Sequence, residues 1–285
     1  MSSHWTSFWQ FQTLRSCFNI GFLALFCLFF GLKLSFLLPK NIAAVSFRTL
    51  LLILCTFCLF CASPSLTFTQ MATGLYTYPI FVVVLAISIL GEKLNHLKVL
   101  ALFLGILGGS LVLKPWDSEF SSLQLLPLLA GLFFACNLIV LRKFCQHESP
   151  FALNAAVAVG FLFSGVVGGL LVDSLNLAKS WFSAMPFIAI GWLPLTLTVV
   201  TISILAAFFN LLGNLCLVRA YQTAESSWLA PLDFLYLVFA LFWGKVMFET
   251  FPDVSALFGM LLILFSGIVV TLQAIRSNKN KQASS

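Results

Sequence analysis

Residues 67–94 read TFTQMATGLYTYPIFVVVLAISILGEKL, and this stretch decides the fold class. Residues 67–90 carry no charged side chain, and a helix needs about 20 mainly apolar residues to cross a bilayer. The part from Pro79 to Leu90 shows no alternating polar period, which disfavours a strand of a membrane barrel. The stretch therefore predicts a transmembrane helix that contains Pro79 and ends at Gly91 and Glu92.

The rest of the chain repeats this pattern. Of its 285 residues, 61% are hydrophobic and 8% are charged, whereas a soluble domain carries roughly 25% charged residues. The sequence predicts an all-α polytopic membrane protein with about nine transmembrane helices. We expect them near residues 17–38, 42–62, 67–90, 96–113, 123–141, 151–172, 194–218, 226–248 and 254–275.

Basic residues indicate the orientation, because they concentrate on the cytoplasmic side of a membrane. Eleven fall on the side that includes the C-terminus: Lys33, Lys40, Arg48, Lys93, Lys98, Arg142, Lys143, Arg219, Arg276, Lys279 and Lys281. Four fall opposite: Arg15, Lys114, Lys179 and Lys245. The bias predicts a cytoplasmic C-terminus with a basic tail at 276–285. The net charge of +6 is spread thinly, which indicates contact with the lipid bilayer and no nucleic-acid partner. The compact chain favours a bacterial inner membrane.

Residues 1–16 form a separate N-terminal segment in this prediction. They contain no cleavable signal and no apolar run, although an odd number of spans with a cytoplasmic C-terminus places the N-terminus outside. Two interpretations remain open. Either Trp5, Phe8, Trp9 and Phe11 anchor the segment at the membrane interface, or the start site omits a first helix.

The chain also repeats itself internally. Ala62 precedes Glu92 by 30 residues with Pro79 between them, and Ala220 precedes Glu249 by 29 residues with Pro231 between them. Each interval is followed by a glycine-containing span. Duplicated halves with an odd number of spans lie in opposite orientation, and this arrangement is typical of transporters with a site near the midplane.

At these residues the chain resembles the drug/metabolite transporter superfamily, in its EamA-domain branch. The resemblance covers roughly residues 15–275 and rests on Ala62, the proline-containing span that ends at Glu92, and their counterparts around Ala220, Pro231 and Glu249. It implies a family plan of ten helices in two inverted five-helix repeats, here at 17–122 and 123–275, the first without its first helix.

Two further stretches, LVLKPW at 111–116 and VMFETFPD at 246–253, are similar to the S-adenosylmethionine uptake carriers of that branch. The resemblance implies a secondary transporter of a small polar metabolite, such as S-adenosylmethionine, an amino acid or an amine. The implied mechanism is alternating access without a cofactor.

Asp233 is the first candidate for substrate binding, because a carboxylate inside a span is expensive unless it faces a cavity or a partner. It could neutralise a cationic substrate or carry a coupling proton or cation; an ion pair with a neighbouring helix is the alternative. Pro79 and Pro231 each remove a backbone donor, so they are candidates for helix breaks or gating, or for simple kinks.

Other polar residues within the spans are also candidates. Asn210 and Asn214 share one helix face and could bind substrate or join helices. Gln70, Thr73 and Tyr76 form a comparable face in the first repeat. Glu92 and Glu249 lie at span ends and are interpreted as caps for short connections.

Small residues predict how the helices pack. Gly105 and Gly109 form a GxxxG pair, and Gly160, Ser164 and Gly168 continue a face of small residues. We expect these faces to contact helices of the same chain, with a homodimer as the alternative.

Enzyme motifs are not found. The three histidines His4, His96 and His147 lie apart, and no metal site or nucleotide-binding motif is predicted. Transport is therefore expected to be gradient-driven. Two other interpretations stay open: a membrane interaction protein that does not transport, and a membrane-embedded lipid enzyme.

Overall fold

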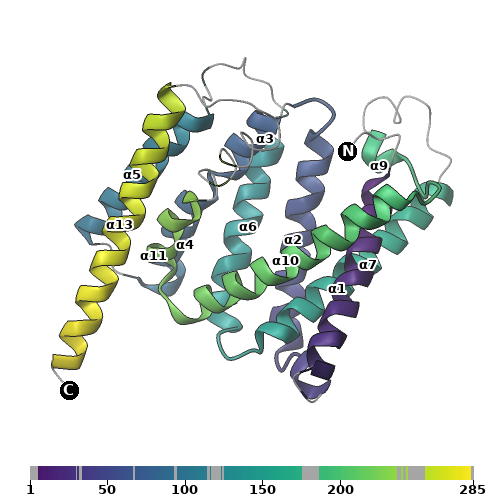
Figure 1. The fold of residues 1–285 in the computed structure, drawn as a ribbon, viewed down its shortest axis with the longest axis horizontal. Coiled ribbons are helices and arrows are strands. Elements are labelled where there is room, and N and C mark those ends of the chain that lie inside the picture. The colour runs from purple at the N-terminus through teal and green to yellow at the C-terminus, as the bar shows by residue number, and fades with distance from the viewer. Residues whose placement is uncertain are drawn as a thin grey trace. The chain divides into compact units, whose positions relative to one another are not determined.

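The computed structural model describes residues 6–29, 31, 34–66, 68–92, 95–113, 116, 123, 125–174, 186–235, 239, 242 and 254–283. Within these ranges the chain is helical, and no strand occurs. The elements, in chain order, are α1 (Phe8–Phe29), η1 (Leu34–Leu37), α2 (Ile42–Ala62), α3 (Phe68–Leu75), α4 (Tyr78–Leu90), α5 (His96–Leu113), α6 (Leu125–Phe144), α7 (Pro150–Ser174), α9 (Pro186–Ala189), α10 (Leu197–Thr223), α11 (Ser226–Asp233) and α13 (Val254–Ala283) (Figure 1).

Five of the described helices are long and apolar enough to cross a membrane. They are Phe8–Phe29, Ile42–Ala62, Leu125–Phe144, Pro150–Val172 and Leu197–Thr223. Shorter apolar helices occupy Tyr78–Leu90, His96–Leu111 and Leu257–Val269. The predicted all-α polytopic membrane fold is confirmed, and α2 and α5 have the predicted bounds.

The first helix differs from the prediction. It occupies Phe8–Phe29 rather than 17–38, so half of the expected N-terminal segment belongs to it. Phe8 is 2% exposed, and Trp9 Nε1 donates a 2.8 Å hydrogen bond to the carbonyl of Ile188. These two aromatic residues pack inside the protein, where the sequence suggested an anchor at the membrane interface. The helix ends before Gly31, which has φ +58°, a conformation that glycine adopts readily.

The predicted helix at 67–90 is two helices, α3 and α4, separated at Tyr76 and Thr77. Pro79 lies in the first turn of α4, where the N–H that proline lacks would have no partner within the helix. The Thr77 hydroxyl donates a 2.7 Å hydrogen bond to the carbonyl of Gly74 at the break. The proline therefore starts a new helix rather than bending a continuous one.

The last helix extends farther than expected. The sequence predicted a span at 254–275 followed by a basic tail, whereas α13 continues to Ala283. The added segment contains lysine, glutamine and alanine, which favour helix.

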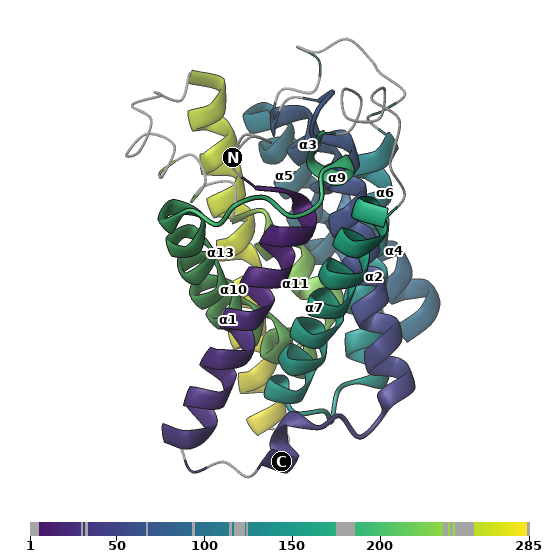
Figure 2. The ribbon, with the colours of Figure 1, turned by 90° about the vertical axis from the view of Figure 1, so that its right-hand side faces the viewer.

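The described chain divides into two compact units, and each takes segments from both halves of the sequence. The first unit comprises Met1–Leu66 and Val140–Thr223. In it, α1 packs along α7 and α10, and α2 packs on α7 (Figures 1 and 2). Close packing of α1 on α7 depends on glycine: a Cβ on Gly165 would lie 2.9 Å from the Trp9 carbonyl oxygen.

The second unit comprises Thr67–Ile139 and Ala224–Ser285. Here α5 packs along α13, and α11 packs against α4, α5 and α13. Gly108 permits the contact of α5 with α13, because a Cβ there would lie 2.6 Å from the Gly259 carbonyl oxygen. Gly105 and Gly160 likewise meet side chains of their own chain, those of Phe234 and Thr49. The prediction of contacts within one chain is confirmed for Gly105 and Gly160.

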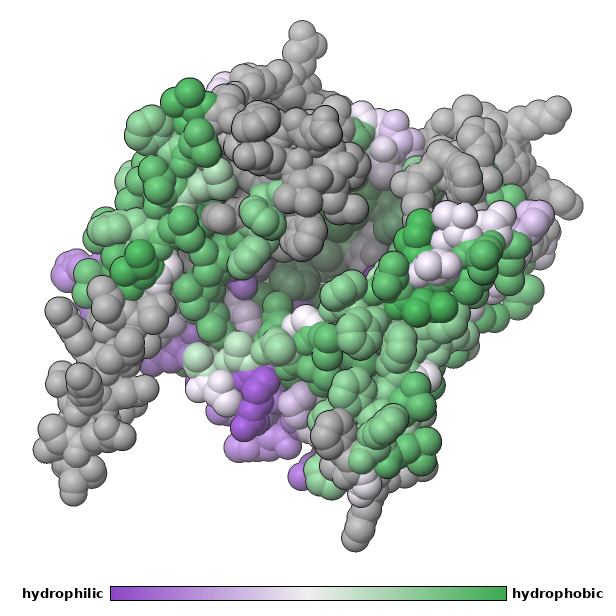
Figure 3. All heavy atoms as spheres, viewed as in Figure 1, coloured by the Kyte–Doolittle hydropathy of each residue, from purple (hydrophilic) through white to green (hydrophobic). Residues whose placement is uncertain are grey.

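The outer faces of the long helices are apolar. Figure 3 shows hydrophobic residues over the visible faces of α13 and α10. Large apolar side chains on them are more than half exposed, among them Phe258, Leu261 and Phe265 of α13 and Leu205 and Phe209 of α10. Such faces suit lipid contact.

Candidate functional site

The predicted site residues fall in both compact units. Tyr76 and Asp233 belong to the second unit, whereas Asn210 and Asn214 belong to the first. Gln70 and Thr73 lie on α3, and their side chains are outside the described part of the structure. Tyr76 packs on a small core formed by Phe234 and Ile263, so it lies near the residue that follows Asp233.

The helices that carry the two predicted proline breaks pack against each other. Pro79 is in the first turn of α4, Pro231 lies within α11, and these two helices pack against each other. Asp233 is the last residue of α11 and is half-buried. The second unit therefore pairs the proline-containing helices of the two sequence halves.

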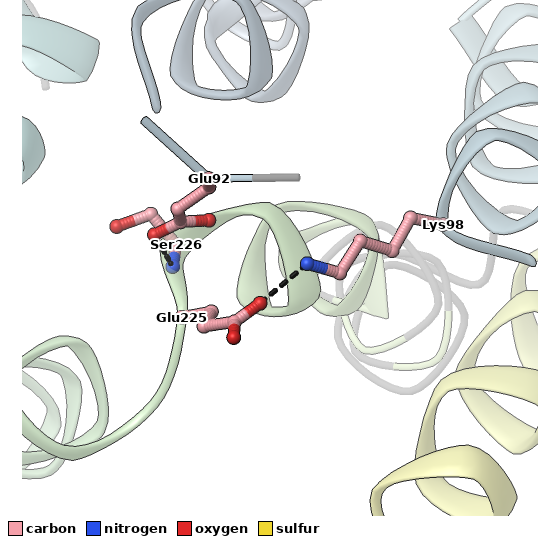
Figure 4. A network of polar contacts seen from close by, with 4 residues as sticks. All are labelled: Glu92, Lys98, Glu225 and Ser226. Atoms are coloured by element: carbon pink, nitrogen blue, oxygen red, sulfur yellow. Dashed lines mark hydrogen bonds and ion pairs between the residues drawn. The ribbon is translucent and has the colours of Figure 1, made fainter. Parts of the chain in front are cut away.

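A polar network fixes the start of α11 (Figure 4). Glu92 Oε1 accepts a 3.0 Å hydrogen bond from the backbone N–H of Ser226. The ammonium of Lys98, which is 5% exposed, pairs with Glu225 and lies 4.9 Å from the centroid of the Trp228 ring. A carboxylate near the first N–H groups of a helix complements the positive end of its dipole. Glu92 thus caps the start of α11, far away in the sequence, where the sequence suggested a cap for the short connection next to its own span; Glu249 lies outside the described residues.

In the first unit, Asn214 has a protein partner. Its Nδ2 donates a 2.6 Å hydrogen bond to Oδ1 of Asn154 on α7, and Asn154 Nδ2 in turn donates to the Pro150 carbonyl at 2.8 Å. Asn210, one turn earlier on α10, is exposed. The geometry thus supports the helix-joining interpretation of Asn214 and gives Asn210 a place on the outer side of its unit.

The first helix carries a polar face that the sequence argument missed. Five polar residues of the helix are buried, and so is Ser7 just before it: Gln10, Gln12, Thr13, Ser16 and Asn19. Arg15, also in the helix, is half-buried. Gln12, Arg15, Ser16 and Asn19 recur at helical spacing, so they share one side of α1. These polar residues can be seen in the sequence, but the predicted boundary after residue 16 divided them between the N-terminal segment and the first span.

Some polar residues of α1 have protein partners. Gln10 Nε2 donates a 2.7 Å hydrogen bond to the Leu193 carbonyl, and the Thr13 hydroxyl donates to the Trp9 carbonyl at 2.8 Å. The first of these bonds joins the connection before α10 to the start of α1, and the second lies within α1.

Other polar atoms of α1 are buried without a partner. These atoms are Gln12 Nε2 and Oε1, Arg15 Nε and Asn19 Oδ1. The Arg15 guanidinium carbon lies 5.9 Å and 5.4 Å from the ring centroids of Phe11 and Phe161. Buried polar groups in proteins are normally hydrogen-bonded, because an unmade bond costs about 1–3 kcal/mol. This side of α1 is therefore suited to a polar ligand or to ordered water.

Arg48 on α2 is a second unexpected feature. Its side chain is 0% exposed, and Nε, Nη1 and Nη2 all lack a hydrogen-bond partner within the described chain. Arg48 and Arg15 were counted among the basic residues of the connections, but both lie in helices.

The polar groups around Arg48 form hydrogen bonds with the backbone and not with Arg48. Glu148 accepts hydrogen bonds from the backbone N–H groups of Lys40 and Asn41 at 2.9 and 2.7 Å. Gln222 Nε2 donates to the carbonyls of Cys145 and Glu148, both at 2.8 Å. Burial raises the pKa of the Cys145 thiol, while nearby Arg48 acts to lower it and Glu148 to raise it. Arg48 thus lies close to the connection between α6 and α7, and no carboxylate of the described residues pairs with it.

A charged side chain in this environment is expensive. Insertion scales assign about 2.5–3.5 kcal/mol to an arginine at the centre of a membrane helix. Among the described residues, no group of three histidine, cysteine or acidic side chains is arranged to hold a metal ion. The unusual chemistry of the first unit is therefore its buried polar atoms and its two arginines.

Comparisons with known proteins point to one functional class. No protein-family model matches the chain. It is 27% identical over 205 residues to an uncharacterized transporter of Helicobacter pylori, covering 71% of this chain and 64% of that protein. It is 25% identical to a riboflavin transporter of Vibrio cholerae, covering 73% and 64%. It is 26% identical to an S-adenosylmethionine uptake transporter of Rickettsia bellii, covering 72% and 62%.

A protein of known crystal structure has the same fold, with a TM-score of 0.68 over 93% of this chain and 88% of that chain at 15% identity. The matches to the curated relatives span less than two thirds of the length of those relatives. The relatives carry the names of transporters and not of enzymes. By fold and by sequence, the chain is thus a multi-pass membrane protein similar to bacterial small-molecule transporters, as its resemblance to the drug/metabolite transporters suggested.

Proposed function

We propose that this protein is a secondary transporter that moves a small polar metabolite across a bacterial inner membrane by alternating access. The polar face of α1 carries the proposal. This membrane-crossing helix buries polar atoms of Gln12, Arg15 and Asn19 that have no hydrogen-bond partner. Burying such atoms costs free energy unless they bind a polar ligand or water. The names of the similar proteins support the same function.

The substrate class follows from two of these relatives. Their names specify riboflavin and S-adenosylmethionine, which are both polar and contain heteroaromatic rings. Amide side chains and an arginine beside phenylalanine rings suit such solutes, because they supply donors and acceptors next to an aromatic surface. Amino acids and amines complete the set of substrates to be tested.

The proposed site has two parts. Asp233 would bind a cationic group or a coupling proton, and Gln70, Thr73 and Tyr76 of the first repeat would contribute polar groups to the substrate. Pro79 and Pro231 are proposed as gating positions in the helices that carry them. Asn210 and Asn214 remain proposed contributors from α10. We propose that the cycle rocks one repeat against the other, with the C-terminus in the cytoplasm, and that the chain acts without catalysis or a cofactor.

Uptake measurements test the function. Cells expressing the chain are given labelled riboflavin, S-adenosylmethionine, amino acids and amines, with and without a protonophore, and cells with the empty vector serve as the control. Saturable uptake that unlabelled solute competes away would support a carrier. If the protein inserts well and the same panel shows neither uptake nor efflux from preloaded vesicles, the carrier proposal fails and an interaction protein is favoured.

A further inference from the structure

Arg48 has charge and hydrogen-bonding capacity that the described protein does not use. All three guanidinium nitrogens are buried and unpartnered, so five N–H donors have no acceptor within the described residues. Another basic residue of the first unit, Arg142, differs: its Nη1 donates a 2.6 Å hydrogen bond to the Gln222 carbonyl. Arg48 is thus exceptional even among the arginines of its own unit.

The carboxylate that could have neutralised Arg48 is committed elsewhere. Glu148 is 6% exposed, and each of its two oxygens accepts a backbone hydrogen bond, from Lys40 and from Asn41. These bonds hold the start of α2 against the connection that precedes α7. Within the described part of the unit, no carboxylate forms an ion pair with Arg48.

A second arginine of the unit lies against the same part of α7. Thr49, the residue after Arg48, contacts the position of Gly160, and Arg15 lies over the ring of Phe161, the next residue along α7. Arg15 Nε is also buried without a partner. The interior of the first unit therefore contains two cationic side chains whose charge no described carboxylate balances.

We propose that Arg48 binds an oxyanion, a carboxylate or phosphate group carried by the transported solute. The planar guanidinium fork matches these groups because it donates two parallel hydrogen bonds to their oxygens. The inference rests on the proposed transport function and adds the charge of the substrate class to it.

Two solute pairs that differ by one charged group test the proposal. Riboflavin is compared with riboflavin 5′-phosphate, and S-adenosylmethionine with its decarboxylated form, with inorganic phosphate as a separate arm. Binding is measured on the purified full chain in lipid nanodiscs as ligand-dependent thermal stabilisation, which is converted to Kd. We expect the oxyanion-bearing member of at least one pair to bind tenfold or more tightly than its partner.

Arg48→Gln and Arg48→Met should abolish that tenfold difference, and Arg48→Lys should retain part of it because it keeps the charge but loses the fork. Arg219→Gln is the matched control, since Arg219 is an exposed arginine of the same unit. Without ligand, Arg48→Met should raise Tm, because it removes an uncompensated buried charge. If Arg48 had a structural role alone, Arg48→Met would have a lower Tm than the wild type.

The outcomes separate the two proposals. Equal binding of both members of each pair by the wild type, or an unchanged difference in Arg48→Gln, overturns the role of Arg48, as does binding of no anion in the panel. If the variants fail to insert, the comparison of solutes on the wild-type protein still tests the proposal. Arg48-dependent binding without any transport would refute the carrier function alone, and binding of inorganic phosphate only would assign the site to a free anion and overturn the solute assignment.

Discussion

Asn214 on α10 and Asn154 on α7 are joined by a hydrogen bond of 2.6 Å between their side-chain amides. Asn154 is 5% exposed and also bonds to the Pro150 carbonyl, so its orientation is fixed at both ends. The pair connects two of the longest helices of the first unit. Amides commonly join membrane helices in this way, which gives Asn214 a structural role whether or not it also contacts a substrate.

Replacing either asparagine should therefore destabilise the first unit. In a double-mutant cycle of Asn154→Ala and Asn214→Ala, we expect a coupling free energy of about 0.6–1.7 kcal/mol, measured by thermal unfolding in nanodiscs. Asn210→Ala is the matched control, because Asn210 is exposed on the same helix, and it should leave stability unchanged. Additive effects of the two substitutions would show that the hydrogen bond contributes nothing.

The Glu92 cap gives a second prediction. Glu92→Ala leaves the backbone N–H of Ser226 without its acceptor and should lower the free energy of unfolding by about 0.5–2 kcal/mol. Glu92→Gln keeps a carbonyl oxygen at the same position and should cost less than half as much. The comparison is made by thermal unfolding monitored by tryptophan fluorescence. Equal losses in the two variants would assign the effect to the lost charge and not to the cap.

Packing of α1 on α7 gives a third prediction. A Cβ at Gly165 would meet Thr13 and lie 2.9 Å from the backbone oxygen of Trp9, which cannot rotate away. Gly165→Ala should lower stability by about 1–3 kcal/mol. Gly213→Ala makes the same chemical change on α10, where nothing lies within 4 Å, so it should be neutral or stabilising by up to about 1 kcal/mol. A Tm for Gly165→Ala equal to that of the wild type would show that α1 and α7 do not pack this closely.

The positions of several helices could be predicted because a helix needs a minimum apolar length to cross a bilayer. Apolar length fixes where α2 and α5 lie, because a charged residue or a turn bounds each apolar run. The same reasoning misplaces α1, because the polar residues among its first turns moved the expected start of the span to residue 17. The break at Tyr76 was foreseeable from Pro79, yet proline is compatible with either a kink or a new helix start.

Candidate site residues are less predictable than helices. Single polar residues within apolar runs, such as Asn214, can be found by inspection, but their partners depend on which helices pack together. Arg48 shows the limit clearly. In the sequence it reads as a basic residue near a span end, and only the packing of α2 on α7 reveals that its guanidinium is buried without a partner. Tertiary contacts, and not composition, decide which polar groups are left for a ligand.

Asp233 gives the last prediction. It ends α11, the helix that Glu92 caps at its start and that packs against the proline-containing α4. Asp233→Asn retains the size of the side chain and removes its charge, so we expect gradient-coupled uptake to fall to the level of the empty vector while membrane insertion is preserved. Asp233→Glu, which keeps the charge, should retain measurable uptake. Uptake by Asp233→Asn that matches the wild type, with the same protonophore sensitivity, would exclude Asp233 from substrate binding and coupling, and would leave the arginines of the first unit as the charged groups through which a solute is recognised.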